Sequence, residues 1–208
     1  MNKMDERIEK AMKALALNKM KPYFVQSREE LHALIRELVS KDRLITAGGS
    51  MTLKESGVTD LLMNEFPNAY IDRSAGKDRE EVEEIMRKAF VSDTFLCSSN
   101  AVTEDGELYN VDGNGNRVSA MIFGPKQVIV VVGVNKLVKD IPEAIKRVET
   151  VAAPKNTVRL DCGTPCTKTG ECVHCRSDKR ICCSYVTLRQ QRVPDRIKVI
   201  FVNESLGY

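Results

Sequence analysis

The chain has 208 residues, of which 42% are hydrophobic and 29% charged, so it is long enough for one mixed domain and too apolar for wholesale disorder. A formal net charge of +3 is too small to indicate a nucleic-acid partner. The longest apolar run, residues 128–134, is far shorter than the roughly 20 residues that a membrane-spanning helix needs. Residues 1–7 are charged where a signal peptide needs an apolar core, so we expect a cytoplasmic protein without a membrane span.

Helical and extended patterns alternate along the chain. The first predicted helix covers residues 1–20 and is ended by Pro22. Further helices are predicted from Ser27, after residue 51, over 78–90 and from Asp140. Strands are predicted at 23–25, 43–46, 69–71, 94–97, 128–132 and 198–202. Thr52 and Glu55 have the spacing of a capping box for the helix after residue 51. The alternation predicts an α/β fold, with a mostly parallel sheet flanked by helices in one domain over residues 1–208. Turn signals at residues 105–106 and 112–113 predict a hairpin inserted into this pattern.

Residues 160–194 form an excursion from the α/β pattern and contain a cysteine cluster. Six of the seven cysteines lie here: Cys162, Cys166, Cys172, Cys175, Cys182 and Cys183. A Cys-x-x-Cys turn places two sulfurs beside one metal, and further cysteines complete a four-thiolate shell for zinc or for an iron–sulfur cluster. The spacing does not choose between the two, and His174 is a further possible ligand. Ordinary reduced cysteines are the plain alternative.

A glycine loop follows the predicted strand at 43–46, and its residues are Gly48, Gly49, Ser50, Met51 and Thr52. Backbone N–H groups in such a loop, with a helix N-terminus, can hold phosphate or carboxylate. Turns between strands and helices are often glycine-rich without a ligand, and neither a P-loop nor a dinucleotide fingerprint is present.

Polar residues also follow the strand at 94–97. Ligands of open α/β sheets sit beyond the carboxyl ends of the strands, so side chains at this end are candidate substrate contacts. They are Ser99, Asn100, Thr103 and Glu104, and Arg117 could pair bidentately with an anionic substrate. A turn with hydrogen-bonding side chains, and a surface arginine, explain the same pattern without a ligand.

Residues 99–106 (Ser-Asn-Ala-Val-Thr-Glu-Asp-Gly), 111–118 (Val-Asp-Gly-Asn-Gly-Asn-Arg-Val) and 122–125 (Ile-Phe-Gly-Pro) resemble the LUD-domain (lactate-utilisation) family. The glycine loop and residues 130–136 and 152–156 continue the resemblance. It implies a fold like that of ribose-5-phosphate isomerase, coenzyme A transferases and 5-formyltetrahydrofolate cyclo-ligases. It also implies a part in the oxidation of lactate to pyruvate.

The cysteine segment is similar to one in stand-alone members of that family, with Pro-Cys at 165–166, Thr-Gly-x-Cys-x-x-Cys at 169–175 and Arg-Ile-Cys at 180–182. This similarity implies Cys166, Cys172, Cys175 and Cys182 as the ligands within a metal-binding segment at 160–184, with Cys162 and Cys183 as alternates. A 4Fe–4S cluster is favoured over zinc. The chain lacks the tandem ferredoxin-type cysteine runs of the larger iron–sulfur partner proteins of lactate utilisation.

The leading hypothesis is therefore a protein of lactate or hydroxy-acid oxidation that binds a small anionic metabolite and passes electrons to a redox partner protein. One alternative is a metabolite-sensing regulatory module with a structural zinc. Another is a group-transfer enzyme of the coenzyme A or acyl type, with Glu104 as acid, base or nucleophile. A homo-oligomer is compatible with each of these hypotheses.

Overall fold

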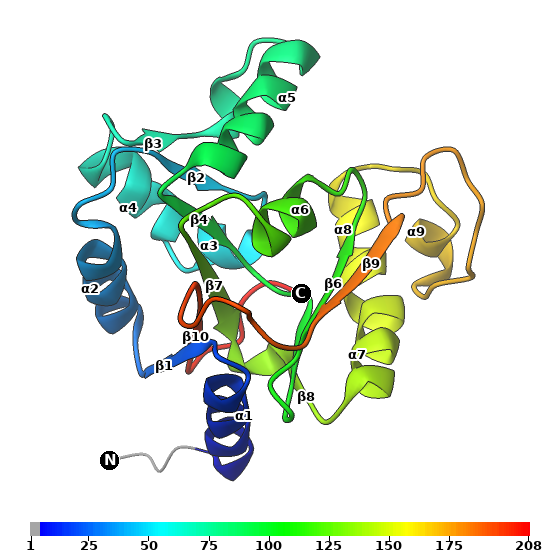
Figure 1. Cartoon of the computed structure of the whole chain (residues 1–208). Helices are drawn as coiled ribbons and strands as arrows, with labels where there is room; N and C mark the ends of the chain where they lie inside the picture. Colours follow the sequence, from blue (N-terminus) through cyan, green and yellow to red (C-terminus); the bar gives the residue numbers. More distant parts are fainter. Residues whose placement is uncertain (1–4) are drawn as a thin grey trace.

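The computed structural model describes residues 5–208, which form two sheets with helices packed around them (Figure 1). The larger sheet has six strands in the order β1-β10-β7-β4-β2-β3, and every neighbouring pair is parallel. Its strands are β1 (Lys21–Val25), β2 (Ile45–Ala47), β3 (Tyr70–Ile71), β4 (Thr94–Cys97), β7 (Gln127–Gly133) and β10 (Ile197–Val202). The predicted α/β fold with a mostly parallel sheet is confirmed.

Helices cover both faces of this sheet, which explains the unbroken apolar run in β7. On one face, Val130 packs in a cluster with residues of α1 (Glu6–Leu17) and α6 (Asn116–Ile122). On the other face, Ile129 packs with residues of α2 (Arg28–Val39), α3 (Met51–Glu55) and α4 (Val58–Glu65). Successive strand side chains point to opposite faces, so a strand between two helical layers must be apolar at every position.

The second sheet has four strands in the order β8-β5-β6-β9: β5 (Ala101–Thr103), β6 (Leu108–Asp112), β8 (Leu137–Val138) and β9 (Ser184–Leu188). The predicted hairpin is present as the antiparallel pair β5–β6, but it is the centre of a sheet rather than an isolated insert. A continuous helical stretch packs on this sheet and consists of α7 (Ile141–Arg147), a π-helical turn (Val148–Ala152) and α8 (Ala153–Arg159). Strand β9 therefore joins the segment 160–194 to the second sheet.

Two predicted helix boundaries are wrong, and both have local causes. The first helix ends at Leu17, because Lys19 adopts a left-handed conformation (φ 60°) and Pro22 lies inside the edge strand β1. The start of that predicted helix, residues 1–4, lies outside the described residues. Ser50, not Thr52, caps α3, since its side chain accepts the N–H of Leu53 at 3.3 Å.

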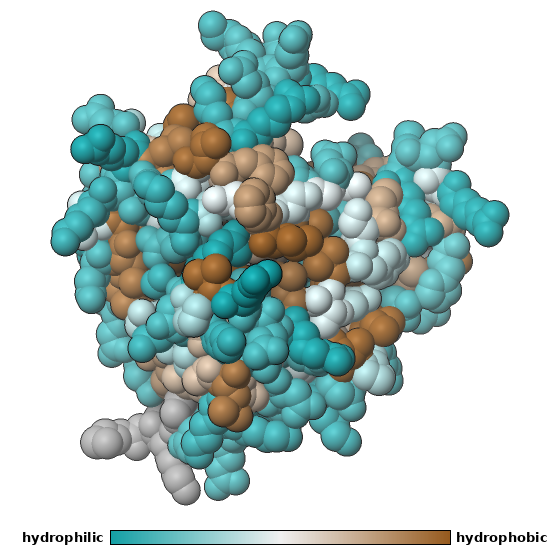
Figure 2. Space-filling model, viewed as in Figure 1, coloured by the Kyte–Doolittle hydropathy of each residue, from teal (hydrophilic) through white to brown (hydrophobic). Residues whose placement is uncertain are grey.

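A small outer lobe follows β3 and consists of the 3-10 turn Arg73–Ala75, α5 (Arg79–Lys88) and the 3-10 turn Ala89–Val91. None of the α5 residues is buried, and Figure 2 shows hydrophilic side chains covering this helix at the top of the molecule. Two further short elements are the 3-10 turn Val134–Lys136 and α9 (Cys166–Thr169). Among the described residues 5–208, no helix combines the length and the apolar character that crossing a bilayer requires.

Candidate functional site

A cleft of about 330 Å³ lies beyond the carboxyl ends of β2, β4 and β7, between the two sheets. This is where open α/β sheets bind ligands. Of the residues predicted to bind substrate, the structure brings Gly49, Ser50, Met51, Thr52, Ser99, Asn100 and Arg117 together in its lining, while Gly48 lies directly behind Arg117.

Two arginine side chains and Phe95 pack closely against the glycine loop. A Cβ atom at position 49 would collide with the Arg73 guanidinium, and one at position 48 would lie 3.4 Å from the Arg117 side chain. The helix that follows, α3, has only five residues, and the Ser50 hydroxyl is already used as its cap. Anion binding here therefore depends on the side chains around the loop rather than on the helix dipole.

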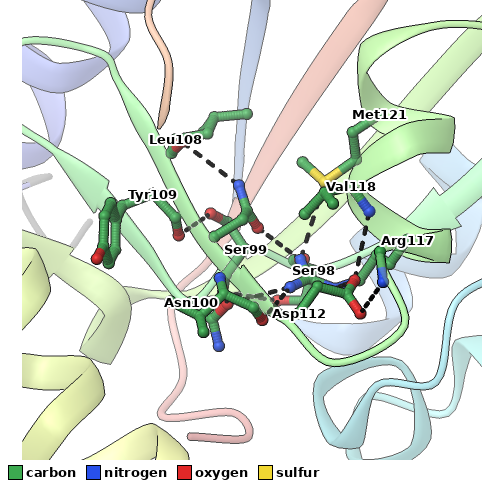
Figure 3. A network of polar contacts seen from close by, with 12 residues as sticks. Ser98, Ser99, Asn100, Leu108, Tyr109, Asp112, Arg117, Val118 and Met121 are labelled. Carbon is green, nitrogen blue, oxygen red and sulfur yellow. Dashed lines mark hydrogen bonds and ion pairs between the residues drawn. The ribbon is translucent and has the colours of Figure 1, made fainter. Parts of the chain in front are cut away.

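Arg117 holds the floor of the cleft together (Figure 3). Its Nη1 donates to Ser98 O at 3.0 Å and to Asn110 Oδ1, and its Nη2 donates to Asn100 Oδ1 at 3.1 Å and to Val111 O at 2.9 Å. Its Nε lies 3.5 Å from an oxygen of Asp112, so all five N–H groups face an internal acceptor. Arg117 is therefore paired with an acid and has no donor left for bidentate pairing with a substrate.

Asn100 is the polar residue of this network that remains open to the cleft. Its Oδ1 accepts from Arg117 and from the Val111 N–H, and its backbone oxygen accepts from Arg147 Nη1 at 2.7 Å. No acceptor among residues 5–208 engages its Nδ2, which is a free donor at the cleft surface.

Lys136 is a lining residue that the sequence interpretation missed. It is only 3% exposed, and its Nζ donates to Thr52 Oγ1 at 2.7 Å and to Ser98 Oγ at 2.9 Å. Burial, together with the charges of Arg147 and Arg117, lowers the pKa of Lys136 to about 7. An amine in this state exchanges its proton near neutral pH.

The C-terminal residues close one side of the cleft. Thr52 Oγ1 donates to Leu206 O at 3.3 Å, and the Gly207 N–H donates to Glu55 Oε2 at 2.6 Å. Tyr208 lines the cleft, and its hydroxyl accepts from Arg159 Nε at 2.6 Å. Both ends of this segment are thus fixed to the body of the fold.

The cleft is strongly cationic. Its basic lining residues are Arg73, Arg117, Lys136 and Arg159, and its single acid, Asp112, is paired with Arg117. The Arg73 guanidinium has no hydrogen-bond or ion-pair partner within residues 5–208, so its donors are available to a ligand. Such a lining attracts negatively charged groups more than positively charged ones.

The structure places two predicted site residues elsewhere. The Glu104 carboxylate faces α1, where it accepts from Arg7 Nε at 2.6 Å and Lys10 Nζ at 3.0 Å, and these cations lower its pKa. Thr103 is buried and bonds to Glu107. A catalytic role for Glu104 stays a prediction, and its placement outside the cleft lining does not support it.

The four cysteines chosen as ligands line one small pocket, which also includes Thr157 and Ile181: they are Cys166, Cys172, Cys175 and Cys182. Thr157 and Thr164 hydroxyls lie 3.3 and 3.2 Å from Cys166 Sγ, and the His174 N–H donates to Cys172 Sγ at 3.4 Å. Burial raises the pKa of Cys182 to about 11, with the neighbouring sulfurs adding to the effect. The donor set suits a thiolate-held centre in its chemistry and in its shared pocket. Within residues 5–208, however, no three His, Cys, Asp or Glu side chains have the arrangement of a formed metal site.

Two contacts hold the cysteine loop in place. Arg180 donates to Cys175 O and Cys182 O, both at 2.7 Å. The Cys172 N–H donates to Glu149 O, at 2.8 Å, in the π-helical turn. The alternates, Cys162 and Cys183, are not part of the pocket lining, and Cys183 Sγ donates to Arg180 O at 3.4 Å. His174 is mostly exposed and lies 3.6 Å from Glu149.

The cleft and the cysteine pocket share a wall. Ile181 lines both of them. Helix α8 contributes Thr157 to the pocket, and Asn156 and Arg159 to the cleft. The two pockets are therefore neighbours in the fold.

Comparison with known proteins agrees with these features of the fold. A family model described as LUD domain matches residues 8–202. The chain is similar in fold to the crystal structure of a DUF162 family protein from Deinococcus radiodurans, with a TM-score of 0.56, 14% sequence identity, and coverage of 95% of this chain and 97% of that one. No curated protein matches the chain.

Proposed function

The chain belongs to the LUD-domain family. We propose that it takes part in the oxidation of lactate or a related hydroxy acid. In this role it binds the small carboxylate and exchanges electrons through a centre held by cysteines. The observation that carries this proposal is the shared wall at Ile181, which puts a cationic cleft beside a four-cysteine pocket. In a cytoplasmic setting these cysteines stay reduced and available as ligands.

The cationic lining supports a carboxylate as the bound group. Arg73 and Arg159 line the cleft and come from two different elements, the 3-10 turn Arg73–Ala75 and α8. The free Nδ2 of Asn100 offers a third, neutral donor for a hydroxyl or carbonyl oxygen. The volume of about 330 Å³ suits a small metabolite.

We expect L-lactate or pyruvate to bind, and Arg73→Gln or Arg159→Gln to weaken binding about tenfold, the equivalent of about 1.4 kcal/mol. Each substitution removes one cation from the lining and leaves the Arg117 network intact, and Arg159→Gln also removes the hydrogen bond to Tyr208. Isothermal titration calorimetry measures the affinities. Lactamide, which has no charge, serves as the control ligand, and Arg79→Gln on exposed α5 serves as the control variant. Equal binding of lactamide and lactate would contradict the proposal.

The four-cysteine pocket supports the redox part of the proposal. An iron–sulfur cluster bound there would accept one electron at a time and pass it to a partner protein. The chain's own contribution is to hold the sulfurs, through Arg180 and the Glu149 carbonyl, and to supply positive charge beside the thiolates. Zinc would make the same pocket a structural site, and this is the metabolite-binding alternative.

Protein purified without oxygen is expected to contain iron and acid-labile sulfide. Cys172→Ser is expected to lose most of the metal, because three remaining cysteines cannot close a four-thiolate shell. Cys183→Ser is the matched control, since its sulfur lies outside the pocket lining. Metal and sulfide analysis distinguishes the outcomes. Stoichiometric zinc without sulfide would end the electron-transfer proposal, and equal losses in the two variants would refute the ligand set.

A further inference from the structure

Lys136 differs from the other cations of the cleft because it is buried and has no counter-ion. It ends the 3-10 turn after β7 and is 3% exposed, and no carboxylate within residues 5–208 forms an ion pair with it. The charged groups that influence it are Arg117 on α6 and Arg147 on α7, which oppose its protonation, and Glu55 on α3, which favours it weakly. Cys97 on β4 is a neutral thiol, since burial raises its pKa to about 12.

The hydrogen bonds around Lys136 Nζ determine which position on this nitrogen remains free. Thr52 Oγ1 donates its hydrogen to Leu206 O, and Ser98 Oγ donates to Ser99 O, each at 3.3 Å. Both hydroxyl oxygens must therefore accept from Lys136, and they use two of its hydrogens. In the neutral amine the remaining position is a lone pair, and Lys136 is one of the residues that line the cleft.

A neutral, desolvated amine beside other cations is the arrangement that activates lysine as a nucleophile toward carbonyl groups. The cationic lining favours an anionic carbonyl compound. We propose that Lys136 condenses with the carbonyl group of a small 2-oxo acid in the cleft and forms an imine. The choice of a 2-oxo acid rests on the proposed function, because such an acid is the product of hydroxy-acid oxidation.

The step is a condensation without net oxidation. The amine lone pair forms the C–N bond, and the carbonyl π electrons move to oxygen, which takes up a proton. The resulting carbinolamine then loses its oxygen as water, whose two hydrogens correspond to the two that leave the amine. Ser98 and Thr52, which hold the amine, are placed to pass protons during these steps.

Trapping with pyruvate and sodium cyanoborohydride tests this inference on the whole protein. Mass spectrometry of the intact chain and of its peptides is expected to show one reduced pyruvyl adduct per chain, at Lys136. Lys136→Arg should abolish it. Lys198→Arg is the matched control, because burial also lowers the pKa of Lys198 while its side chain lies outside the cleft. Lys136 should be labelled at about pH 7, where a large fraction of its amine is neutral while lysines of ordinary pKa remain protonated.

Adducts spread over many lysines, or a yield unchanged in Lys136→Arg, would overturn the inference. The native protein alone gives the site of labelling, so the test does not depend on the folding of a variant. If lactate binds but Lys136 is not labelled, the imine is refuted and the proposed function stands. If Lys136 is labelled and excess lactate does not slow the labelling, the imine stands and hydroxy-acid binding in the cleft is refuted.

Discussion

Replacing Arg117 with methionine is expected to lower the free energy of unfolding by about 3 kcal/mol. The substitution leaves buried hydrogen-bond acceptors and the Asp112 carboxylate without their partner. The guanidinium joins the end of β4, β6 and α6 through Ser98 O, Asn100 Oδ1 and Val111 O (Figure 3). Its side chain is only 13% exposed, so water cannot replace these bonds fully. Urea denaturation followed by circular dichroism measures the loss.

Arg79→Met is the matched control for this prediction. Arg79 is 94% exposed and pairs only with Glu83 along α5, so its loss should change stability by less than about 0.5 kcal/mol. A second variant, Arg117→Lys, should recover a small part of the stability, since one ammonium cannot serve five acceptors in different directions. Full stability in Arg117→Met would mean that the network does not hold the two sheets together.

Lys136→Met is expected to act in the opposite direction and to raise the free energy of unfolding by roughly 2 kcal/mol at pH 7. The pKa of Lys136 falls from 10.5 to about 7 on folding, so the native protein bears the cost of discharging or burying this amine. The substitution removes that cost. It also leaves the Thr52 and Ser98 hydroxyls with their own acceptors, Leu206 O and Ser99 O.

The pH dependence identifies the cause of this stabilisation. Between about pH 7 and 10.5 the unfolded state binds more protons at Lys136 than the folded state does, so native stability rises with pH. The advantage of Lys136→Met is therefore largest at and below pH 7 and disappears toward pH 10.5. Exposed Lys155→Met should show no such trend. An advantage independent of pH would point to better packing instead of a relieved charge.

The sequence is informative where one local pattern determines one element. The apolar run at 128–132 predicts a strand, and the structure covers that strand on both faces. The rule that ligands lie beyond the carboxyl ends of strands points to Ser99 and Asn100, which line the cleft. The same rule applied to β7 would have indicated Lys136, a lone cation just after the most apolar strand. Arg73 and Arg159 carry no such signal, because only the tertiary fold brings a 3-10 turn and a helix end to the glycine loop.

Of the second sheet, the sequence predicts only the β5–β6 hairpin, because the other two strands also depend on the tertiary fold. Strand β8 has two residues, and β9 alternates between half-buried and exposed positions, so neither has a strong apolar pattern. Both are defined by their partners, β5 and β6, which lie far away in the sequence. The predicted hairpin suggests that Glu104 lies close to Asn100, whereas the Glu104 carboxylate faces Arg7 and Lys10 of α1.

The position of the C-terminus has a practical consequence for biochemical work. Tyr208 stands at the cleft, hydrogen-bonded to Arg159, whereas α1 starts on a different side of the molecule (Figure 1). A segment attached after Tyr208 would begin beside the ligand site. Recombinant protein for metal analysis and for titration should carry a removable tag ahead of Met1.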